Sequence, residues 1–228
     1  MSASSLLLWD IDGTLVCTDR AGERSLLLLI RDLYQRDLQD KLPVALQGRT
    51  DTSIIRDIFD FLGMTHTPEE ALRFRTAYLA LLPKTLAAGN ARLQPGIREA
   101  LDAVHAHPEI HQGLLTGNIE EGARLKLSHL GIWHYFEFGA YADDSHIRNE
   151  LGPFALKRAR EKLGIDFAPE NVYIIGDTPH DIACGKAIGA KTIAVATGSF
   201  TVAELEAEKP THTFQDLADT QALLKVIL

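Results

Sequence analysis

From about Gln94 to the C-terminus, short apolar runs alternate with amphipathic helical patterns, and this alternation restricts the possible fold more than any other feature. Runs of strand length fall at 112–118, 135–141, 171–177, 191–197 and 211–214. Helical patterns cover 95–107, 119–131, 151–164, 178–189, 204–209 and 216–228. A further apolar run begins at Ser5. Alternating strands and helices predict an α/β fold, a Rossmann-like parallel sheet with helices on both faces.

Residues 19–90 interrupt this alternation with helical patterns alone, at 24–38, 51–63 and 68–86. A helical block after the first strand predicts a small all-helical cap, 19–90, inserted into a core made of 1–18 and 91–228. Because such a cap must open for ligands to enter and leave, we expect flexible joins near Val16–Gly22 and Gly89–Pro95.

Polar residues follow the predicted strands at their carboxyl ends, which share one edge of a parallel sheet and form the usual ligand site. Asp10 and Asp12 are two residues apart in extended chain and so can face the same cleft. The other residues at this edge are Thr116, Gly117 and Asn118 after the second strand, Arg148 before the helix that follows the third, and Asp177 and Asp181 after the fourth.

The four carboxylates of this edge, Asp10, Asp12, Asp177 and Asp181, would repel one another unless a cation neutralises them. A hard divalent ion such as Mg²⁺ suits oxygen ligands, and no histidine or cysteine accompanies the cluster as a zinc site would require. Each part alone has a simpler interpretation: Asp-Gly is a common turn, and Thr116 could be a helix N-cap. Their conjunction at the strand ends favours a functional site.

Composition excludes several classes of protein. The net charge is -8 with no basic block, which argues against a nucleic-acid partner. Cys17 and Cys184 are far apart and show no metal-binding spacing, which is typical of free thiols in a reducing cytoplasm. The apolar run Leu6–Trp9 is too short for a signal peptide or a membrane span. We therefore expect a cytoplasmic monomer or homodimer that acts away from membranes.

The motifs "DIDGTL", "LLTGN" and "GDTPHD", in this order and with a helical insert after the first, resemble the signature of the haloacid dehalogenase superfamily. The "GRTD" at 48–51 and the segment 174–198 are most similar to its phosphoglycolate-phosphatase-like branch. The resemblance implies a magnesium-dependent phosphatase that hydrolyses a small phosphorylated metabolite through an aspartyl-phosphate.

The resemblance also implies residue roles. Asp10 would be the nucleophile, and Asp12 would be the general acid and then the general base. Mg²⁺ would be held by the Asp10 carboxylate, the Asp12 backbone carbonyl and the Asp177 carboxylate, with Asp181 acting directly or through water. Thr116 and the backbone N–H groups of Gly117 and Asn118 would bind phosphoryl oxygens.

The cation that completes the phosphate site departs from the commonest family pattern, because no lysine followed closely by proline precedes the helix at 151–164. Arg148 is the favoured equivalent and could bind phosphate through two N–H groups, with Lys157 as the alternative. In "GRTD", Arg49 and Thr50 either project toward substrate or belong to a helix-opening turn capped by Thr50 or Asp51.

Other functions stay open on the same motifs. A sugar phosphomutase similar to β-phosphoglucomutase would share every core motif and differ in the lifetime of the aspartyl-phosphate. A non-catalytic phosphate-binding module would have no need of Asp12. A dehalogenase would not need the metal carboxylates, and a phosphonatase would need a cap lysine for which only Lys41 and Lys84 are candidates.

Overall fold

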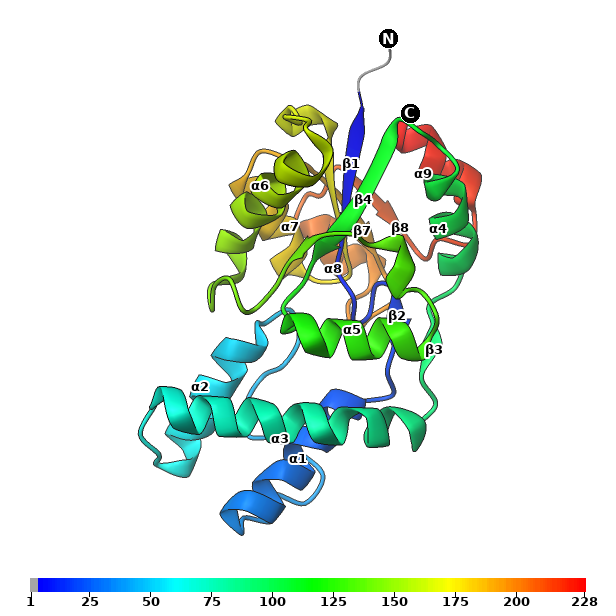
Figure 1. Ribbon diagram of the computed structural model, residues 1–228. Helices are drawn as coiled ribbons and strands as arrows, with labels where there is room; N and C mark the ends of the chain where they lie inside the picture. Colours follow the sequence, from blue (N-terminus) through cyan, green and yellow to red (C-terminus); the bar gives the residue numbers. More distant parts are fainter. Residues whose placement is uncertain (1–3) are drawn as a thin grey trace.

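The computed structural model describes residues 4–228, and a six-stranded parallel sheet forms its centre (Figure 1). The strand order is β5-β4-β1-β6-β7-β8. The strands are β1 (Ser5–Trp9), β4 (Ile110–Leu115), β5 (Gly139–Ala140), β6 (Val172–Gly176), β7 (Lys191–Val195) and β8 (His212–Phe214). Because β1 lies between β4 and β6, the later strands are added on both sides of it, and its carboxyl end is the position where such sheets bind ligands.

Both faces of the sheet are buried, as a parallel sheet requires. Successive side chains of β1 point to opposite faces, so Leu7 and Trp9 join one apolar core and Leu6 and Leu8 join the other. Helices α4 (Ile97–His105) and α9 (Thr220–Ile227) cover the first face. Helices α6 (Leu151–Leu163) and α7 (Pro179–Ala187) cover the second. The predicted α/β fold is confirmed.

Two further helices complete this part of the chain, α5 (Glu120–His129) after β4 and the short α8 (Val202–Ala207) after β7. Single turns of 3-10 helix occur at Trp133–Tyr135, Arg148–Glu150 and Pro169–Asn171. Within residues 4–228, no helix combines the length and the apolar character that crossing a bilayer would need.

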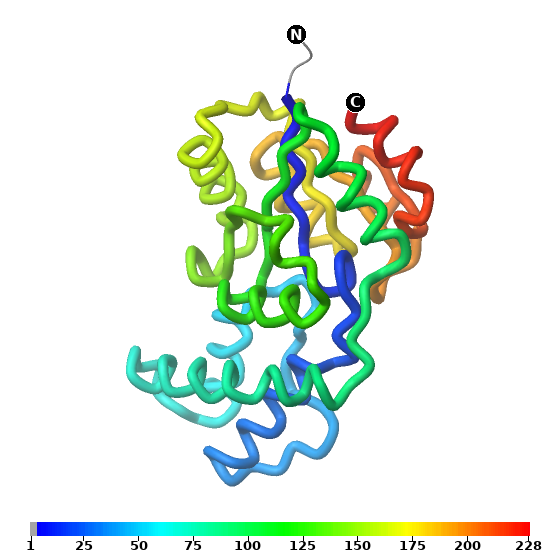
Figure 2. Tube along the Cα trace, turned by 45° about the vertical axis from the view of Figure 1, so that its right-hand side comes forward, coloured from blue at the N-terminus to red at the C-terminus, as the bar shows by residue number. Residues whose placement is uncertain are grey.

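Residues 19–90, all of them described, contain helices α1 (Ala21–Tyr34), α2 (Asp51–Leu62) and α3 (Pro68–Ala87) and no strand. Figures 1 and 2 show these helices together beyond the carboxyl ends of the strands, at the far side of the sheet from the N-terminus. They share a separate apolar core around Phe59, Phe74 and Leu82, to which Ile119 of the sheet side contributes. We call residues 19–90 the helical segment; its role as a movable cap stays a prediction.

The two connections to the helical segment lie side by side. Strand β2 (Val16–Cys17) pairs with β3 (Arg92–Leu93) in a short antiparallel ribbon. The segments expected to be flexible joins are therefore hydrogen-bonded to each other. Any hinge movement must move this ribbon as one unit or bend the chain next to it.

Several predicted elements have other bounds in the structure; the helix expected over 216–228, for example, begins at Thr220, where Asp219 caps α9. The strand expected over 135–141 is reduced to Gly139–Ala140, because Trp133–Tyr135 forms a 3-10 turn and the chain meets β4 only at Leu114 and Leu115. The helix expected over 24–38 ends at Tyr34, because Gln35 adopts a left-handed conformation with φ of 53° that terminates it.

Candidate active site

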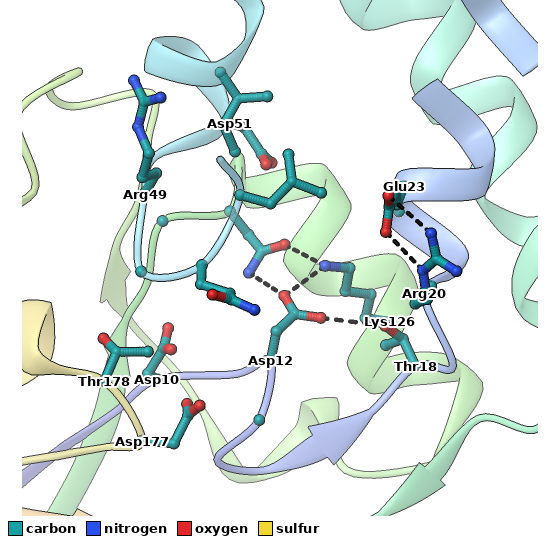
Figure 3. Close-up of a pocket in the computed structure, with 18 of the residues that line it drawn as sticks. Asp10, Asp12, Thr18, Arg20, Glu23, Arg49, Asp51, Lys126, Asp177 and Thr178 are labelled. Carbon is teal, nitrogen blue, oxygen red and sulfur yellow. Dashed lines mark hydrogen bonds and ion pairs between the residues drawn. The ribbon is translucent and has the colours of Figure 1, made fainter. Parts of the chain in front are cut away.

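A cavity of about 300 Å³ lies between the carboxyl ends of the central strands and the helical segment (Figure 3). Its sheet side includes Asp10, Asp12, Asn118, Lys126, Arg148 and Asp177. Its helical side includes Arg20, Glu23, Arg49 and Asp51. The cavity thus gathers charged groups from segments far apart in the sequence, at the edge of the sheet where the strand ends predicted a site.

Asp10 forms the floor of this cavity directly after β1. Its backbone N–H continues the ladder by donating to the carbonyl of Ile175, at 2.9 Å, which fixes the residue against β6. The side chain is buried, and its Oδ1 lies 3.1 Å from Nη2 of Arg148. Burial, with the charge of the neighbouring Asp181, raises the pKa of Asp10 to about 6 against the opposing charge of Arg148. The carboxylate therefore needs positive charge nearby to stay ionised.

Asp10, Asp177 and Asp181 form a buried acidic trio, each offering an oxygen within 4.8 Å of the others. Burial and the charges of Asp181 and Asp10 raise the pKa of Asp177 well above its usual range. Asp177 accepts one hydrogen bond, from the Thr14 hydroxyl at 2.9 Å. An oxygen-preferring divalent cation fits this cluster because it would relieve the repulsion.

The Asp181 carboxylate is already engaged on both oxygens. Oδ1 accepts from Arg148, and Oδ2 accepts from the backbone N–H of Thr178 at 3.0 Å and from its hydroxyl at 2.8 Å. These bonds cap α7 and hold the guanidinium in place. Of the two modes left open for Asp181, contact with a metal through water fits these bonds better than direct ligation.

Asp12 is turned away from the acidic trio. Its Oδ2 accepts from the ammonium of Lys126 at 2.5 Å and from the Asn118 amide at 2.9 Å, and its Oδ1 accepts from the Thr18 hydroxyl at 3.3 Å. Burial acts to raise the pKa of Asp12, but the charge and hydrogen bond of Lys126, with Asn118 and Thr18, outweigh it and hold the pKa low. The Asp12 side chain is thus not part of the acidic trio. That its backbone carbonyl would hold Mg²⁺ stays a prediction.

The loop after β4 brings Gly117 and Asn118 to the cavity, whereas Thr116 is fully buried. The Thr116 hydroxyl accepts from the Asn118 side-chain amide at 2.9 Å. Gly117 has no room for a side chain, since a Cβ there would overlap the Arg49 carbonyl oxygen and lie 2.9 Å from Nη1 of Arg148. The phosphate contacts expected of this loop stay predictions, and the Thr116 hydroxyl is at present directed to Asn118.

Arg148, in the 3-10 turn before α6, reaches the acidic trio with a side chain that is 6% exposed. Its Nε is buried and has no hydrogen-bond partner among the described residues, which leaves a donor for a bound anion. The alternative cation, Lys157, points to solvent with a side chain that is 71% exposed and pairs with Glu161 at 3.8 Å. The geometry therefore places Arg148, and not Lys157, beside Asp10.

The start of α2 lies against the β4 loop. Thr50 is buried and caps α2 by accepting from the Ser53 backbone N–H at 3.2 Å, while its hydroxyl donates to the His146 carbonyl. The helix-opening alternative thus accounts for Thr50. Arg49 lines the cavity and is paired with Asp57. Asp51 accepts from the Ile119 backbone N–H at 2.9 Å, and burial raises its pKa to about 6.

Sequence reasoning did not identify Lys126 as a site residue. A signal was available, because Lys126 falls at helical spacing with the small or apolar residues Gly122, Ala123 and Leu127, which all face inward on α5. A lysine on an inward face is unusual unless it is paired. Its partner could not be read from the pattern, since Asp12 is 114 residues away in sequence.

Known proteins resemble this chain over nearly its whole length. The probable phosphatase IndB of Dickeya dadantii (strain 3937) is 27% identical over 97% of this chain and 95% of its own length. The pyrophosphatase PpaX of Bacillus mycoides (strain KBAB4) is 26% identical over 97% of each chain. The structure of a predicted phosphoglycolate phosphatase from Haemophilus somnus superposes with a TM-score of 0.71 over 100% of both chains at 20% identity.

The match to a protein family covers most of the chain. Residues 7–186, which include every strand-end residue described above, match the family model for haloacid dehalogenase-like hydrolases. The chain belongs to the haloacid dehalogenase-like hydrolase family.

Proposed function

We propose that this protein is a magnesium-dependent phosphatase that hydrolyses a small phosphomonoester through an aspartyl-phosphate on Asp10. The observation that carries the proposal is the placement of Asp10, a buried carboxylate on the cavity floor that belongs to the acidic trio and lies beside Arg148. Arg148 lines the same cavity, and its Nε has no partner among the described residues, which supports an anion site beside Asp10.

The first step transfers the phosphoryl group to the enzyme. A carboxylate oxygen of Asp10 attacks phosphorus while the bond from phosphorus to the ester oxygen breaks. Asp12, protonated in the complex that reacts, gives its proton to the departing oxygen, which leaves as an alcohol. Arg148 and the backbone of Gly117 and Asn118 stabilise the charge on the equatorial oxygens.

The second step restores the enzyme. Asp12 accepts a proton from water as the water oxygen bonds to phosphorus and the bond from phosphorus to Asp10 breaks, which releases inorganic phosphate. The low pKa of Asp12, maintained chiefly by Lys126, favours the carboxylate form that this step needs. The proton that Asp12 gives to the alcohol in the first step is thus replaced by the proton that it accepts from water in the second.

Asp10 and Asp177 are the carboxylates that would hold Mg²⁺, with Asp181 behind them through water. When bound, the ion supplies positive charge that offsets the acidic trio and the phosphoryl oxygens. Asp177 fits here because Gly13 and Gly198 have no Cβ that would overlap its carboxylate, and the Thr14 hydroxyl donates to one of its oxygens. The raised pKa values of Asp10 and Asp177 are the electrostatic support for a cation here.

The cavity favours a small substrate. Its volume of about 300 Å³ is limited by the chain at the starts of α1 and α2, which brings Arg20, Arg49 and Asp51 to the wall opposite Asp10. The relatives whose names include phosphatase, pyrophosphatase and phosphoglycolate phosphatase support the same reaction class and differ in the group that leaves. We therefore propose a small phosphorylated metabolite, with phosphoglycolate among the first to test.

The test is phosphate release from phosphoglycolate, pyrophosphate, sugar phosphates and p-nitrophenyl phosphate, with Mg²⁺ and with EDTA, for the wild type and Asp10→Asn. We expect Mg²⁺-dependent release from at least one ester and none from the variant. Release that survives EDTA or the substitution would sink the mechanism. Conversion of a sugar phosphate to its isomer in place of phosphate release would identify the phosphomutase instead.

A further inference from the structure

We propose that Lys126 is a positioning residue for proton transfer: with Asn118 it occupies Oδ2 of Asp12 and leaves Oδ1 to exchange the proton with the leaving group and with water. This inference rests on the phosphatase function proposed above, since it assigns the atom through which Asp12 acts. Lys126 lies on α5, so the inference adds to the site a residue that does not follow a strand.

Lys126 comes from the inward face of α5, and its side chain is only 6% exposed. Its ammonium lies 2.5 Å from Oδ2 of Asp12 and 2.6 Å from Oδ1 of Asn118. Removing an ammonium from water is unfavourable unless it is paired and hydrogen-bonded, so these two contacts are what makes the burial possible. Figure 3 shows the side chains of Lys126 and Asp12 meeting in the cavity wall.

The ammonium also fixes the orientation of the Asn118 amide. A lysine ammonium can only donate, so the atom of Asn118 that faces it must be the carbonyl oxygen. The amide nitrogen is then directed to Oδ2 of Asp12 at 2.9 Å and to the Thr116 hydroxyl at 2.9 Å. Lys126 thus ties the carboxylate of Asp12 to the loop that is expected to bind phosphate.

The two carboxylate oxygens of Asp12 differ in the hydrogen bonds that they accept. Oδ2 receives two donors, one of them charged, whereas Oδ1 receives only the Thr18 hydroxyl at the long distance of 3.3 Å among the described residues. The Asp12 side chain is 41% exposed, and the residue lines the cavity. Oδ1 is therefore the oxygen with capacity for a proton, on a side chain that reaches the cavity.

Both proton transfers then take place at Oδ1 of Asp12. The proton on Oδ1 passes to the ester oxygen as its bond to phosphorus breaks, and Oδ1 later accepts a proton from the attacking water. Lys126 keeps its own protons throughout and acts only by holding the carboxylate. Its loss should therefore impair proton transfer more than phosphoryl binding.

The experiment measures kcat/KM for p-nitrophenyl phosphate and phenyl phosphate with Mg²⁺, because the poorer phenolate leaving group depends more on protonation. We expect Lys126→Met to lower kcat/KM for phenyl phosphate by about 100-fold, and for p-nitrophenyl phosphate by less than about 10-fold. Asp12→Asn should show the same inequality. The matched control is Lys157→Met, an exposed lysine on α6, which should change neither value.

A double variant separates positioning from an independent effect. In the Asp12→Asn background, Lys126→Met should cost little more, because the carboxylate that it positions is already lost. If Lys126→Met fails to fold, Asn118→Ala removes the other donor to Oδ2 and should show the same unequal loss.

Equal losses for the two esters, full additivity in the double variant, or wild-type rates in Lys126→Met would each overturn the inference. These outcomes leave the phosphatase proposal intact, since the wild type would still turn over both esters. Only a wild type that releases phosphate from no ester contradicts the proposed function itself.

Discussion

Nη2 of Arg148 lies 3.1 Å from Oδ1 of Asp10 and also donates to Oδ1 of Asp181, so one guanidinium joins the proposed nucleophile to a second carboxylate of the acidic trio. The arrangement is buried, and the two carboxylates raise the pKa of the guanidinium above its usual range despite its burial. A second nitrogen, Nε, is left without a partner among the described residues. Arg148 therefore combines a structural role with a donor that the described residues leave unused.

Arg148→Ala should lower kcat by about 10²- to 10³-fold, because it removes a donor to the phosphoryl oxygens. It should also destabilise the fold by about 3–5 kcal/mol, since Asp10 and Asp181 lose their buried counter-charge. Steady-state assays and urea unfolding measure the two effects. Lys157→Ala is the control, and if it alone abolishes turnover the assignment of Arg148 is wrong.

Asp177→Asn should separate the effect of Mg²⁺ binding on the Tm from the stability of the fold without the ion. Without Mg²⁺ the variant should melt at a higher temperature than the wild type, because one charge leaves a cluster whose members raise each other's pKa values. Added Mg²⁺ should raise the Tm of the wild type by mass action and leave that of the variant nearly unchanged. Equal Mg²⁺ shifts in both proteins would place the cation elsewhere.

Most of the fold could be predicted because its signals are local. The apolar runs of β1, β6 and β7 and the amphipathic patterns between them specify a parallel sheet without knowledge of any long-range contact. The prediction of a strand over 135–141 was largely wrong because aromatic residues such as Phe136 and Phe138 are common in strands, but here they enter the apolar cores from irregular chain between the 3-10 turn and β5.

The site was predictable where topology alone brings residues together. Asp10 and Asp177 follow neighbouring parallel strands, so their proximity follows from the strand order. Lys126 and Asp51 were not identified, because their roles depend on how α5 and α2 dock at the strand ends. Such contacts between distant segments have no period or spacing in the sequence.

Gly198→Ala should impair the metal site, although Gly198 was not a predicted residue. A Cβ at this position would overlap Oδ2 of Asp177, so the carboxylate must move. Since a displacement of about 1 Å can cost about 100-fold in rate, we expect a loss of that order with a higher Mg²⁺ requirement. Gly131→Ala is the matched control: its φ of +70° strains the backbone by about 1 kcal/mol, but nothing lies within 4 Å, so activity should persist.

Asp51→Asn should change how stability depends on pH. Burial, with smaller contributions from Asp12 and Asp143, raises the pKa of Asp51 from 3.8 to about 6 in the fold, against the opposing charge of Lys126. Between these values the folded protein binds more protons at Asp51 than the unfolded chain does. The free energy of unfolding contributed by this group therefore falls as pH rises from about 4 to about 6, by about 2 kcal/mol.

An asparagine does not titrate and can still accept the Ile119 N–H, so the variant should become progressively more stable than the wild type across that interval. Urea unfolding at intervals from pH 4 to pH 8 measures the difference. Asp57→Asn gives the opposite sign, because Arg49 lowers the pKa of Asp57 and its stabilisation is lost as pH falls; partial exposure makes this effect weaker. If the free energy of unfolding of Asp51→Asn and of the wild type changed with pH in parallel, the raised pKa of Asp51 would be contradicted.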